Sequence, residues 1–313
     1  MTSSAITRDE TVPSAAGHVA LVLLYIFLWS SGFAPSRVVL REIPALWVLG
    51  ARLVIAGSIL LAVARVRGLE MPRTRLQWVT AVAVGVLVNV VYLGLLYVAL
   101  HDLSSGMAAI IASTNPLVLA LVAPALLGET PRRGTILGIL IGFGGVAYTM
   151  WSRVGNALES PRSIVVAFVS VLGLVASTVV YKRAEYPPRM VMAATGVQLL
   201  VGSALLLPAA AIVNGAPTIP HDVASWLSFA YLTLVMSVGA SLLWFWLLAH
   251  GDATRLSAFY FLVPVFGLVI GHLLLGEVVT ARDALGAIVI AVGISLAQRA
   301  GSTTKPGRTL DEL

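Results

Sequence analysis

Uncharged polar and aromatic side chains recur inside the long apolar segments of this sequence. Such groups cost free energy in hydrocarbon unless they pair with one another or face water or a ligand. Together, hydroxyl, amide, phenol and indole groups suit reversible hydrogen bonding to a small amphipathic molecule. Those that could line one cavity are Trp29, Ser30, Asn89, Tyr92, Asn115, Ser177, Tyr181, Ser241, Trp244 and Tyr260. An alternative stays open, because serines often bond their own helix backbone and tryptophans often anchor a helix at the membrane surface.

Arg52 is the single basic residue deep inside an apolar segment. Placing a guanidinium there costs ~2.5–3.5 kcal/mol on insertion scales, so the side chain needs a partner. It either attracts a substrate carboxylate or reaches toward the membrane surface to join Glu42 or backbone carbonyls, and we favour this structural role. Every aspartate and glutamate lies at a segment end, in a loop or in a tail. Proton coupling through a buried carboxylate is therefore not expected.

Catalytic and metal-binding chemistry finds no support in the residue pattern. Ser30, Ser31, Ser104 and Ser105 have no histidine at a spacing that suggests a nucleophile with its base. The five histidines are scattered among segment ends, and cysteine is absent, which removes thiolate chemistry and cysteine-based metal sites. We therefore expect a protein that is not an enzyme and that uses no metal or cofactor.

The segments that carry the polar side chains are predicted to be membrane-spanning helices. Hydrophobic residues make up 58% of the 313 residues and charged residues 11%, with a mean hydropathy of +0.95, which is far too apolar for a soluble domain. A helix needs ~20 residues to cross the hydrocarbon of a bilayer. The sequence predicts an all-α integral membrane protein with ten such helices, at 18–40, 44–64, 76–99, 103–127, 134–152, 163–183, 189–213, 223–249, 254–275 and 283–299.

One stretch of the sequence occurs twice. The segment from Asn115-Pro116 to Gly128-Glu129 returns as Val263-Pro264 to Gly276-Glu277. A proline at the same place in both copies frees a backbone carbonyl about one turn earlier, so Pro116 and Pro264 are candidates for a helix kink or a gating hinge. The repeats are predicted at 18–152 and 163–299, between a disordered tail at 1–17 and a second tail at 300–313. Because each repeat holds an odd number of helices, the second is predicted to be inverted, which is typical of transporters with a site near mid-membrane.

Charges at the segment ends predict orientation and local contacts. Most lysines and arginines fall in loops on the side that holds both chain ends, so the positive-inside rule predicts cytoplasmic termini, and the net charge of +6 does not indicate nucleic-acid binding. Glu129 and Glu277 either form a gate, with arginines 132, 133 and 282 near them, or anchor helix ends. Thr130-Pro131 and the pair Thr280 and Asp283 are predicted helix starts.

A glycine series in the fifth and tenth segments allows close approach between helices. Its members at equivalent places in the two repeats are Gly138 with Gly286 and Gly145 with Gly293. The two segments either form a rigid scaffold at the edge of each half or form the face of a homodimer.

Ten spans in two halves, with Leu127-Gly128-Glu129 after the fourth span and Leu275-Gly276-Glu277 after the ninth, resemble the drug/metabolite transporter superfamily. The opening stretch Leu28-Trp29-Ser30-Ser31-Gly32-Phe33 is similar to the start of its EamA-type members, and the likeness covers about residues 18 to 299. Within these members the sequence looks most like the YddG-type exporters of aromatic and other amino acids. The resemblance implies export of small metabolites from the cytoplasm across a bacterial inner membrane.

The pattern favours a carrier whose two halves rock around a central cavity, opening it in turn to each side. The aromatic and apolar candidate lining suits amino acids with uncharged or aromatic side chains better than nucleotides, which demand several cations. The expected partners are a small-molecule substrate and membrane lipid, without nucleic acid, and a homodimer is a further option. Export of other small metabolites or drugs, or a passive channel, are the alternative functions.

Overall fold

The structure is a computed structural model, and it describes residues 15–115, 117–119, 121–122, 130–131, 133–155, 159–182, 186–243, 247, 262–300 and 302–303. Seven helices within these residues are long and apolar enough to cross a membrane, and shorter apolar helices lie at 105–119 and 263–275. The predicted all-α membrane architecture is confirmed. Pro116, Glu129, Trp244 and Tyr260 lie outside the described residues.

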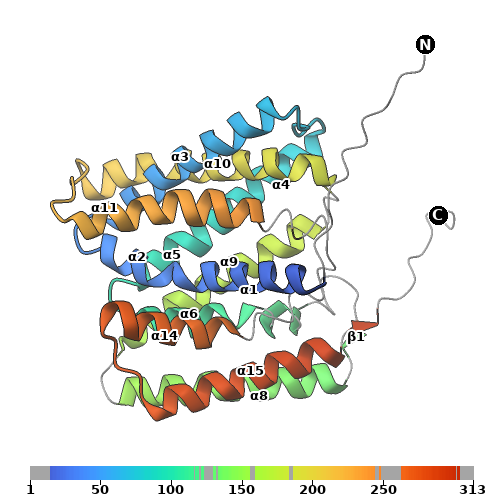
Figure 1. Cartoon of the computed structure of the whole chain (residues 1–313), viewed down its shortest axis with the longest axis vertical. Helices are drawn as coiled ribbons and strands as arrows, with labels where there is room; N and C mark the ends of the chain where they lie inside the picture. Colours follow the sequence, from blue (N-terminus) through green and yellow to red (C-terminus); the bar gives the residue numbers. More distant parts are fainter. Residues whose placement is uncertain are drawn as a thin grey trace.

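The helices follow the predicted spans closely, because long apolar runs between charged loops fix their positions. Figure 1 shows them side by side, with α3 and α10 near one edge of the bundle and α8 with α15 at the opposite edge. The helical elements are α1 (Ala15–Ser31), α2 (Phe33–Val39), α3 (Ala45–Val66), α4 (Arg75–Gly85), η1 (Val86–Tyr92), α5 (Leu93–Ala99), α6 (Ser105–Ala112), α8 (Arg133–Gly155), α9 (Pro161–Lys182), α10 (Pro188–Asn214), α11 (Val223–Ala230), η2 (Tyr231–Ala240), α14 (Val263–Leu275) and α15 (Ala281–Ala300).

Side-chain caps set several helix starts. Thr74 begins α4 through a capping box with Gln77, and Asp222 begins α11 at the position equivalent to Thr74 in the second repeat. The predicted start at Thr280 is confirmed, since its backbone N–H donates to Asp283 Oδ2 over 2.8 Å and the Asp283 N–H donates to Thr280 Oγ1 over 3.2 Å.

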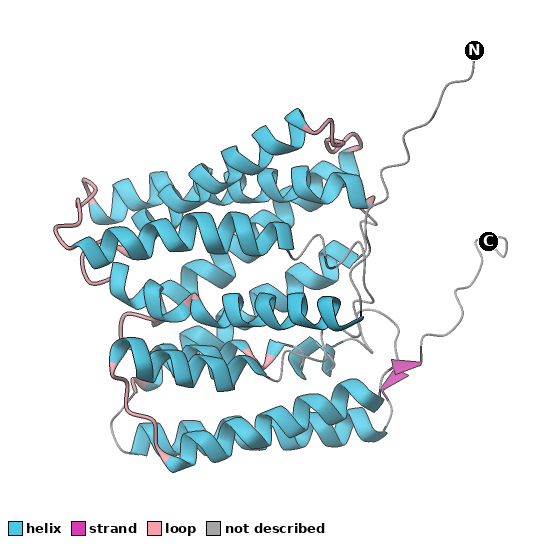
Figure 2. Ribbon diagram, in the orientation of Figure 1, coloured by secondary structure: helices cyan, strands magenta, loops and turns pink. Residues whose placement is uncertain are grey.

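The predicted helix start at Thr130-Pro131 is wrong. These two residues form the short strand β1 (Thr130–Pro131), which pairs antiparallel with β2 (Ser302–Thr303), and α8 begins at Arg133. Pairing with the chain beyond α15 draws the two residues into an extended conformation, which a local capping pattern does not foresee. Figure 2 shows the strand pair on the side of the bundle where α15 ends.

Two spans contain π-helical turns at equivalent places. The third span runs α4, η1, α5, and the eighth runs α11, η2; adding the 148-residue repeat spacing to residues 86–92 gives 234–240, which lies inside η2. A π-helix has more residues per turn than an α-helix, so it displaces the side chains that follow it, and such turns occur often at functional sites.

Glycines join α8 to α15 within the chain. A Cβ added at Gly293 would lie 2.4 Å from the Gly142 nitrogen, and one added at Gly138 would lie 2.6 Å from the Gly293 oxygen. The two backbones therefore touch, which only glycine allows. The series serves as a scaffold between the fifth and tenth helices, and a homodimer stays a prediction.

Candidate functional site

A buried cluster around Arg52 joins four elements of the bundle. From α3, Arg52 donates its Nε hydrogen to Ser237 Oγ in η2 and an Nη1 hydrogen to Tyr97 Oη in α5, each over 2.6 Å. Ser36 of α2 also donates to Tyr97 Oη, over 2.8 Å. All four side chains belong to buried residues, and Arg52 is only 7% exposed. The guanidinium is therefore held inside the bundle by hydroxyl groups.

The π-helix η2 presents Ser237 to this cluster. The Ser237 hydroxyl donates to the Leu232 carbonyl, five residues earlier, over 3.1 Å, a spacing that the wide turn provides. The same oxygen accepts a hydrogen bond from Arg52. The hydroxyl therefore links the guanidinium to a backbone carbonyl through two hydrogen bonds. The widened turn thus supplies an acceptor in the bundle interior.

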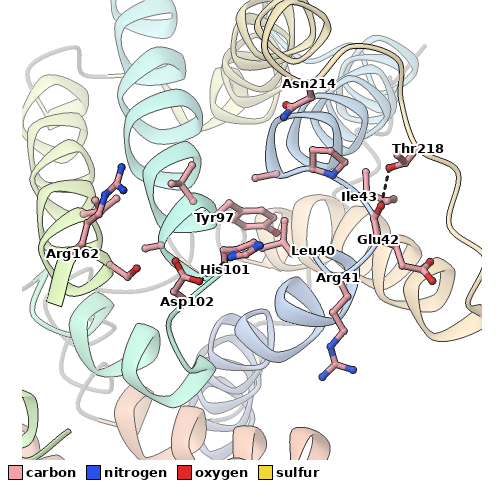
Figure 3. A pocket seen from close by; sticks show the side chains of 16 residues that line it. Leu40, Arg41, Glu42, Ile43, Tyr97, His101, Asp102, Arg162, Asn214 and Thr218 are labelled. Atoms are coloured by element: carbon pink, nitrogen blue, oxygen red, sulfur yellow. Dashed lines mark hydrogen bonds and ion pairs between the residues drawn. The ribbon is translucent and has the colours of Figure 1, made fainter. Parts of the chain in front are cut away.

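A cavity of about 580 Å³ reaches Tyr97 from one face of the bundle. Figure 3 shows Tyr97 and His101 near its middle, with Arg162 on one side and Arg41 extending away from the other side chains. Its walls are Leu40, Arg41, Glu42, Ile43, Pro44, Ala45, Tyr97, Val98, Ala99, His101, Asp102, Arg162, Ser163, Val166, Asn214 and Thr218. Tyr97 therefore both lines this cavity and bonds the buried guanidinium.

The predicted anchor Glu277 is held at the beginning of α6. Gly276, at φ +64°, ends α14 in the left-handed conformation that glycine favours, and Glu277 follows it. The Glu277 carboxylate accepts from the backbone N–H groups of Ser105 and Gly106 over 2.7 and 3.1 Å and from Arg37 Nη1 over 2.9 Å. It thereby joins α14, α6 and α2 through Arg37, rather than through the neighbouring Arg282.

Burial and hydrogen bonding act in opposite directions on Glu277. Burial raises its pKa, but the backbone N–H groups of Ser105 and Gly106, the Ser105 hydroxyl and Arg37 favour the charged form and together hold the pKa below its usual value of 4.5. The ion pair is therefore formed at neutral pH.

A second buried arginine is fully paired. Arg153, 3% exposed, donates from Nε and Nη2 to Asp283 over 2.9 and 3.0 Å and from Nη1 to Glu159 over 2.7 Å. Glu159 also accepts from the backbone N–H and the hydroxyl of Ser104. This network ties the end of α8 to the starts of α15 and α6, and its charges are compensated within the protein.

The EamA-like transporter family model matches the chain twice, at residues 17–151 and 161–298. The chain belongs to the EamA-like transporter family. It is therefore a multi-pass membrane transporter of the drug/metabolite transporter superfamily, and each half of the chain carries one match. The inverted arrangement of the halves stays a prediction.

Curated relatives of this EamA-family chain are themselves described as transporters. It is 29% identical over 276 residues to the uncharacterized inner membrane transporter YedA of Escherichia coli K12, covering 87% of this chain and 88% of the relative. It is 26% identical over 289 residues to the uncharacterized transporter sll0355 of Synechocystis, covering 86% of each. A solved crystal structure aligns with a TM-score of 0.65 at 20% identity, over 91% of this chain and 97% of the other, which shows a shared fold.

Several predicted lining residues of the EamA-family chain bond within their own helices. Ser30 donates to the Ile26 carbonyl over 2.8 Å, and Ser177 donates to the Leu174 carbonyl over 2.6 Å. These are the backbone bonds that the alternative explanation allows. Ser241 follows directly after η2, one turn beyond Ser237.

The aromatic candidates lie on separate elements. Trp29 packs near Tyr25 within α1, with ring centroids 6.3 Å apart, and Tyr181 of α9 packs on Tyr186 at 5.3 Å. Tyr92 is buried in η1. Their role as lining stays a prediction, since the two ring contacts given above do not join one candidate to another.

Two predicted amides keep unused hydrogen-bonding atoms. Asn89 donates from Nδ2 to the Gln198 carbonyl over 2.9 Å, but its Oδ1 is buried and has no partner from the described residues. Asn115 Oδ1 and Gln198 Nε2 are in the same situation. Pro264 lies in the first turn of α14, which begins at Val263, and Pro116 is outside the described residues.

The sequence reasoning missed Ser36, Tyr97 and Ser237, which hold Arg52. One signal was available, because Ser237 lies 148 residues after Asn89 and so occupies the equivalent position in the second repeat. A candidate on one repeat points to its counterpart on the other. Tyr97 had no such signal, since its helix-end position suggests an ordinary interface aromatic.

Proposed function

We propose that this EamA-family transporter exports small amphipathic metabolites, chiefly neutral and aromatic amino acids, from the bacterial cytoplasm by alternating access. Three buried amide atoms without a partner among the described residues carry the proposal: Asn89 Oδ1, Asn115 Oδ1 and Gln198 Nε2. Buried polar atoms are almost always hydrogen-bonded, so these acceptors and this donor call for a polar ligand or water. A molecule with both kinds of group in a largely apolar setting fits them.

The charge balance of the interior supports a small substrate. Of the two buried arginines in the described residues, Arg153 is neutralised by Asp283 and Glu159, which leaves Arg52. Nucleotides and sugar phosphates carry several negative charges and need several cations. A zwitterion with an uncharged side chain needs far fewer cations in the site.

The Arg37 and Glu277 ion pair supports a gate on the face where the cavity opens. It joins α2, in the first half of the chain, to the end of α14, in the second half. The Arg37 side chain is 31% exposed and that of Glu277 is 10% exposed, so the pair lies partly open to water. A movement of one half against the other would break this contact, as alternating access requires.

Membrane orientation and location follow from loop charges and relatives. The basic loops lie on the side of the bundle where α1 begins and α15 ends, which favours cytoplasmic termini. The Escherichia coli relative is named as an inner membrane transporter. The cavity would then open away from the cytoplasm in this conformation.

Uptake into proteoliposomes tests the function. Labelled tryptophan, phenylalanine and threonine are added outside, with and without unlabelled substrate inside and with and without a pH gradient. A carrier gives saturable uptake that internal substrate accelerates, and the absence of a deep carboxylate predicts indifference to the pH gradient. Flux that rises linearly with concentration would show a pore instead, and no flux of any of the three would reject the amino-acid assignment.

A further inference from the structure

Arg52 has no acidic partner among the described residues. Its contacts there are the neutral hydroxyls of Ser237 and Tyr97, and it takes part in no ion pair of the described residues. Arg153 gives the comparison inside the same molecule, because it is buried to a similar extent and has two carboxylates. Among the described residues, Arg153 thus has two carboxylates as counter-charges and Arg52 has none.

An uncompensated buried charge is expensive in a membrane interior. Hydroxyl dipoles reduce that cost, but they carry no opposite charge. The guanidinium has five N–H donors in a rigid fork, and within the described part of the chain one on Nε and one on Nη1 are bonded. The unused donors, including both on Nη2, have the geometry that binds a planar carboxylate through two oxygens.

The cavity gives an anion a route to this fork. Tyr97 lines the cavity on one side and bonds Arg52 on the other, and Ser36 fixes the same phenol from α2. Figure 3 shows the Tyr97 ring between Asp102, which follows α5, and Leu40 and Ile43, which follow α2. Tyr97 is thus a side chain of the cavity wall that contacts Arg52 directly.

We propose that Arg52 binds the carboxylate of the transported molecule, and that Tyr97 and Ser237 hold the guanidinium in place while no substrate is bound. The inference rests on the proposed transport function and adds to it the charged group that the protein recognises. It predicts that substrates share a carboxylate, whatever their side chains, and that molecules of the same shape with an amine alone are poor ligands.

Ligand pairs that differ in one group test the proposal. The thermal unfolding midpoint of the purified full chain is measured with phenylalanine, with 3-phenylpropionate, which lacks the ammonium, and with phenethylamine, which lacks the carboxylate. The expected result is stabilisation by the first two, with an apparent affinity at least tenfold above that for phenethylamine. Equal affinity for all three would overturn the proposal, and so would stabilisation by chloride that competes with 3-phenylpropionate, since the site would then hold an inorganic anion.

Substitutions assign the preference to Arg52. Arg52→Gln should lower the affinity for 3-phenylpropionate at least tenfold and abolish its advantage over phenethylamine. Arg52→Lys keeps the positive charge but lacks the planar fork of N–H donors. It should therefore keep the preference for the carboxylate ligand but bind it at least fivefold more weakly. This variant replaces Arg52→Gln in the test if the glutamine variant does not fold. The matched control is Arg75→Gln, an exposed arginine at the beginning of α4, which should bind as the unaltered protein does. An unchanged preference in Arg52→Gln, or an unchanged affinity in Arg52→Lys, would overturn the proposal.

The two proposals can fail separately. If amino acids are transported and Arg52→Gln still prefers carboxylates, the transport function stands and the role of Arg52 is wrong. If 3-phenylpropionate binds through Arg52 while no amino acid binds or moves, the carboxylate site stands and the amino-acid assignment is wrong.

Discussion

The guanidinium of Arg37 lies 2.9 Å from the carboxylate of Glu277, although the two residues are 240 positions apart. This contact depends on Gly276, whose left-handed conformation ends α14 and directs the following residue toward the beginning of α6. The repeated Gly-Glu pattern of the sequence therefore has a physical meaning at this copy: the glycine ends one helix and the glutamate caps another. A single carboxylate holds three helices together.

Replacing Glu277 with glutamine should destabilise the protein by about 1–3 kcal/mol, because the ion pair and the charge-assisted bonds from Ser105 and Gly106 weaken. The measurement is thermal unfolding of the purified protein in detergent. Glu70→Gln is the matched control, since this loop carboxylate forms no ion pair with the described residues, and the unfolding free energy should change by less than about 0.5 kcal/mol. Equal effects of the two substitutions would contradict the role given to Glu277.

The same carboxylate predicts a pH dependence. Its pKa in the folded protein lies below 4.5, so the stability it contributes is fully present above about pH 4.5 and is lost as the pH falls through the folded value. The difference in unfolding free energy between the unaltered protein and Glu277→Gln should therefore be constant near neutral pH and shrink below pH 4.5. A difference that stays constant down to pH 3 would show that the carboxylate is not held in its charged form.

The packing of α8 on α15 predicts opposite effects on stability for alanine substitutions at two glycines. Gly293→Ala should cost about 1–3 kcal/mol, because its Cβ would meet the Gly142 backbone at 2.4 Å. A Cβ added at Gly144 would have no heavy atom within 4 Å. Gly144→Ala should therefore stabilise α8 by about 0.5–1 kcal/mol through its higher helix propensity. The unfolding midpoints of both variants test this prediction. An unchanged midpoint for Gly293→Ala would mean that the two helices are not in backbone contact.

The membrane helices could be predicted from sequence because their signals are local. Apolar runs of spanning length and capping residues such as Thr280 lie within or beside the helix that they define. The Arg52 cluster could not be predicted in this way, since Tyr97 is 45 residues and Ser237 is 185 residues away from it. The favoured structural role for Arg52 is a contact with Glu42 or with backbone carbonyls, but its partners are the hydroxyls of Tyr97 and Ser237, and Glu42 accepts from the backbone of His221 and Asp222.

The π-helices η1 and η2 could not be predicted from the sequence either. A span that is apolar on every side keeps the same hydrophobic pattern whether it winds as an α-helix or a π-helix. The repeat spacing could have linked the two turns only after one of them was known. The polar candidates were found more easily, because Asn89 and Asn115 stand out by type alone, while their unpaired oxygens became visible only in three dimensions.

Asn115 gives a prediction that separates stability from function. Leucine has nearly the same shape and removes the buried Oδ1, which has no partner among the described residues, so Asn115→Leu should leave the unfolding midpoint unchanged or raise it. If that oxygen accepts a hydrogen bond from substrate, uptake should fall at least fivefold. Unfolding and proteoliposome uptake are measured on the same preparation, and loss of stability together with uptake would indicate a structural amide.

The absence of cysteine makes the orientation directly measurable, because any introduced thiol is the only one in the chain. Thr218→Cys places a thiol at the cavity mouth, and Arg67→Cys places one in the exposed loop after α3. Cytoplasmic termini put the cavity mouth outside the cell, so a membrane-impermeant maleimide added to intact spheroplasts should label the first variant and not the second. Both should react after lysis. The reverse labelling pattern would show the opposite orientation in the membrane. The cavity would then be the entrance on the cytoplasmic side.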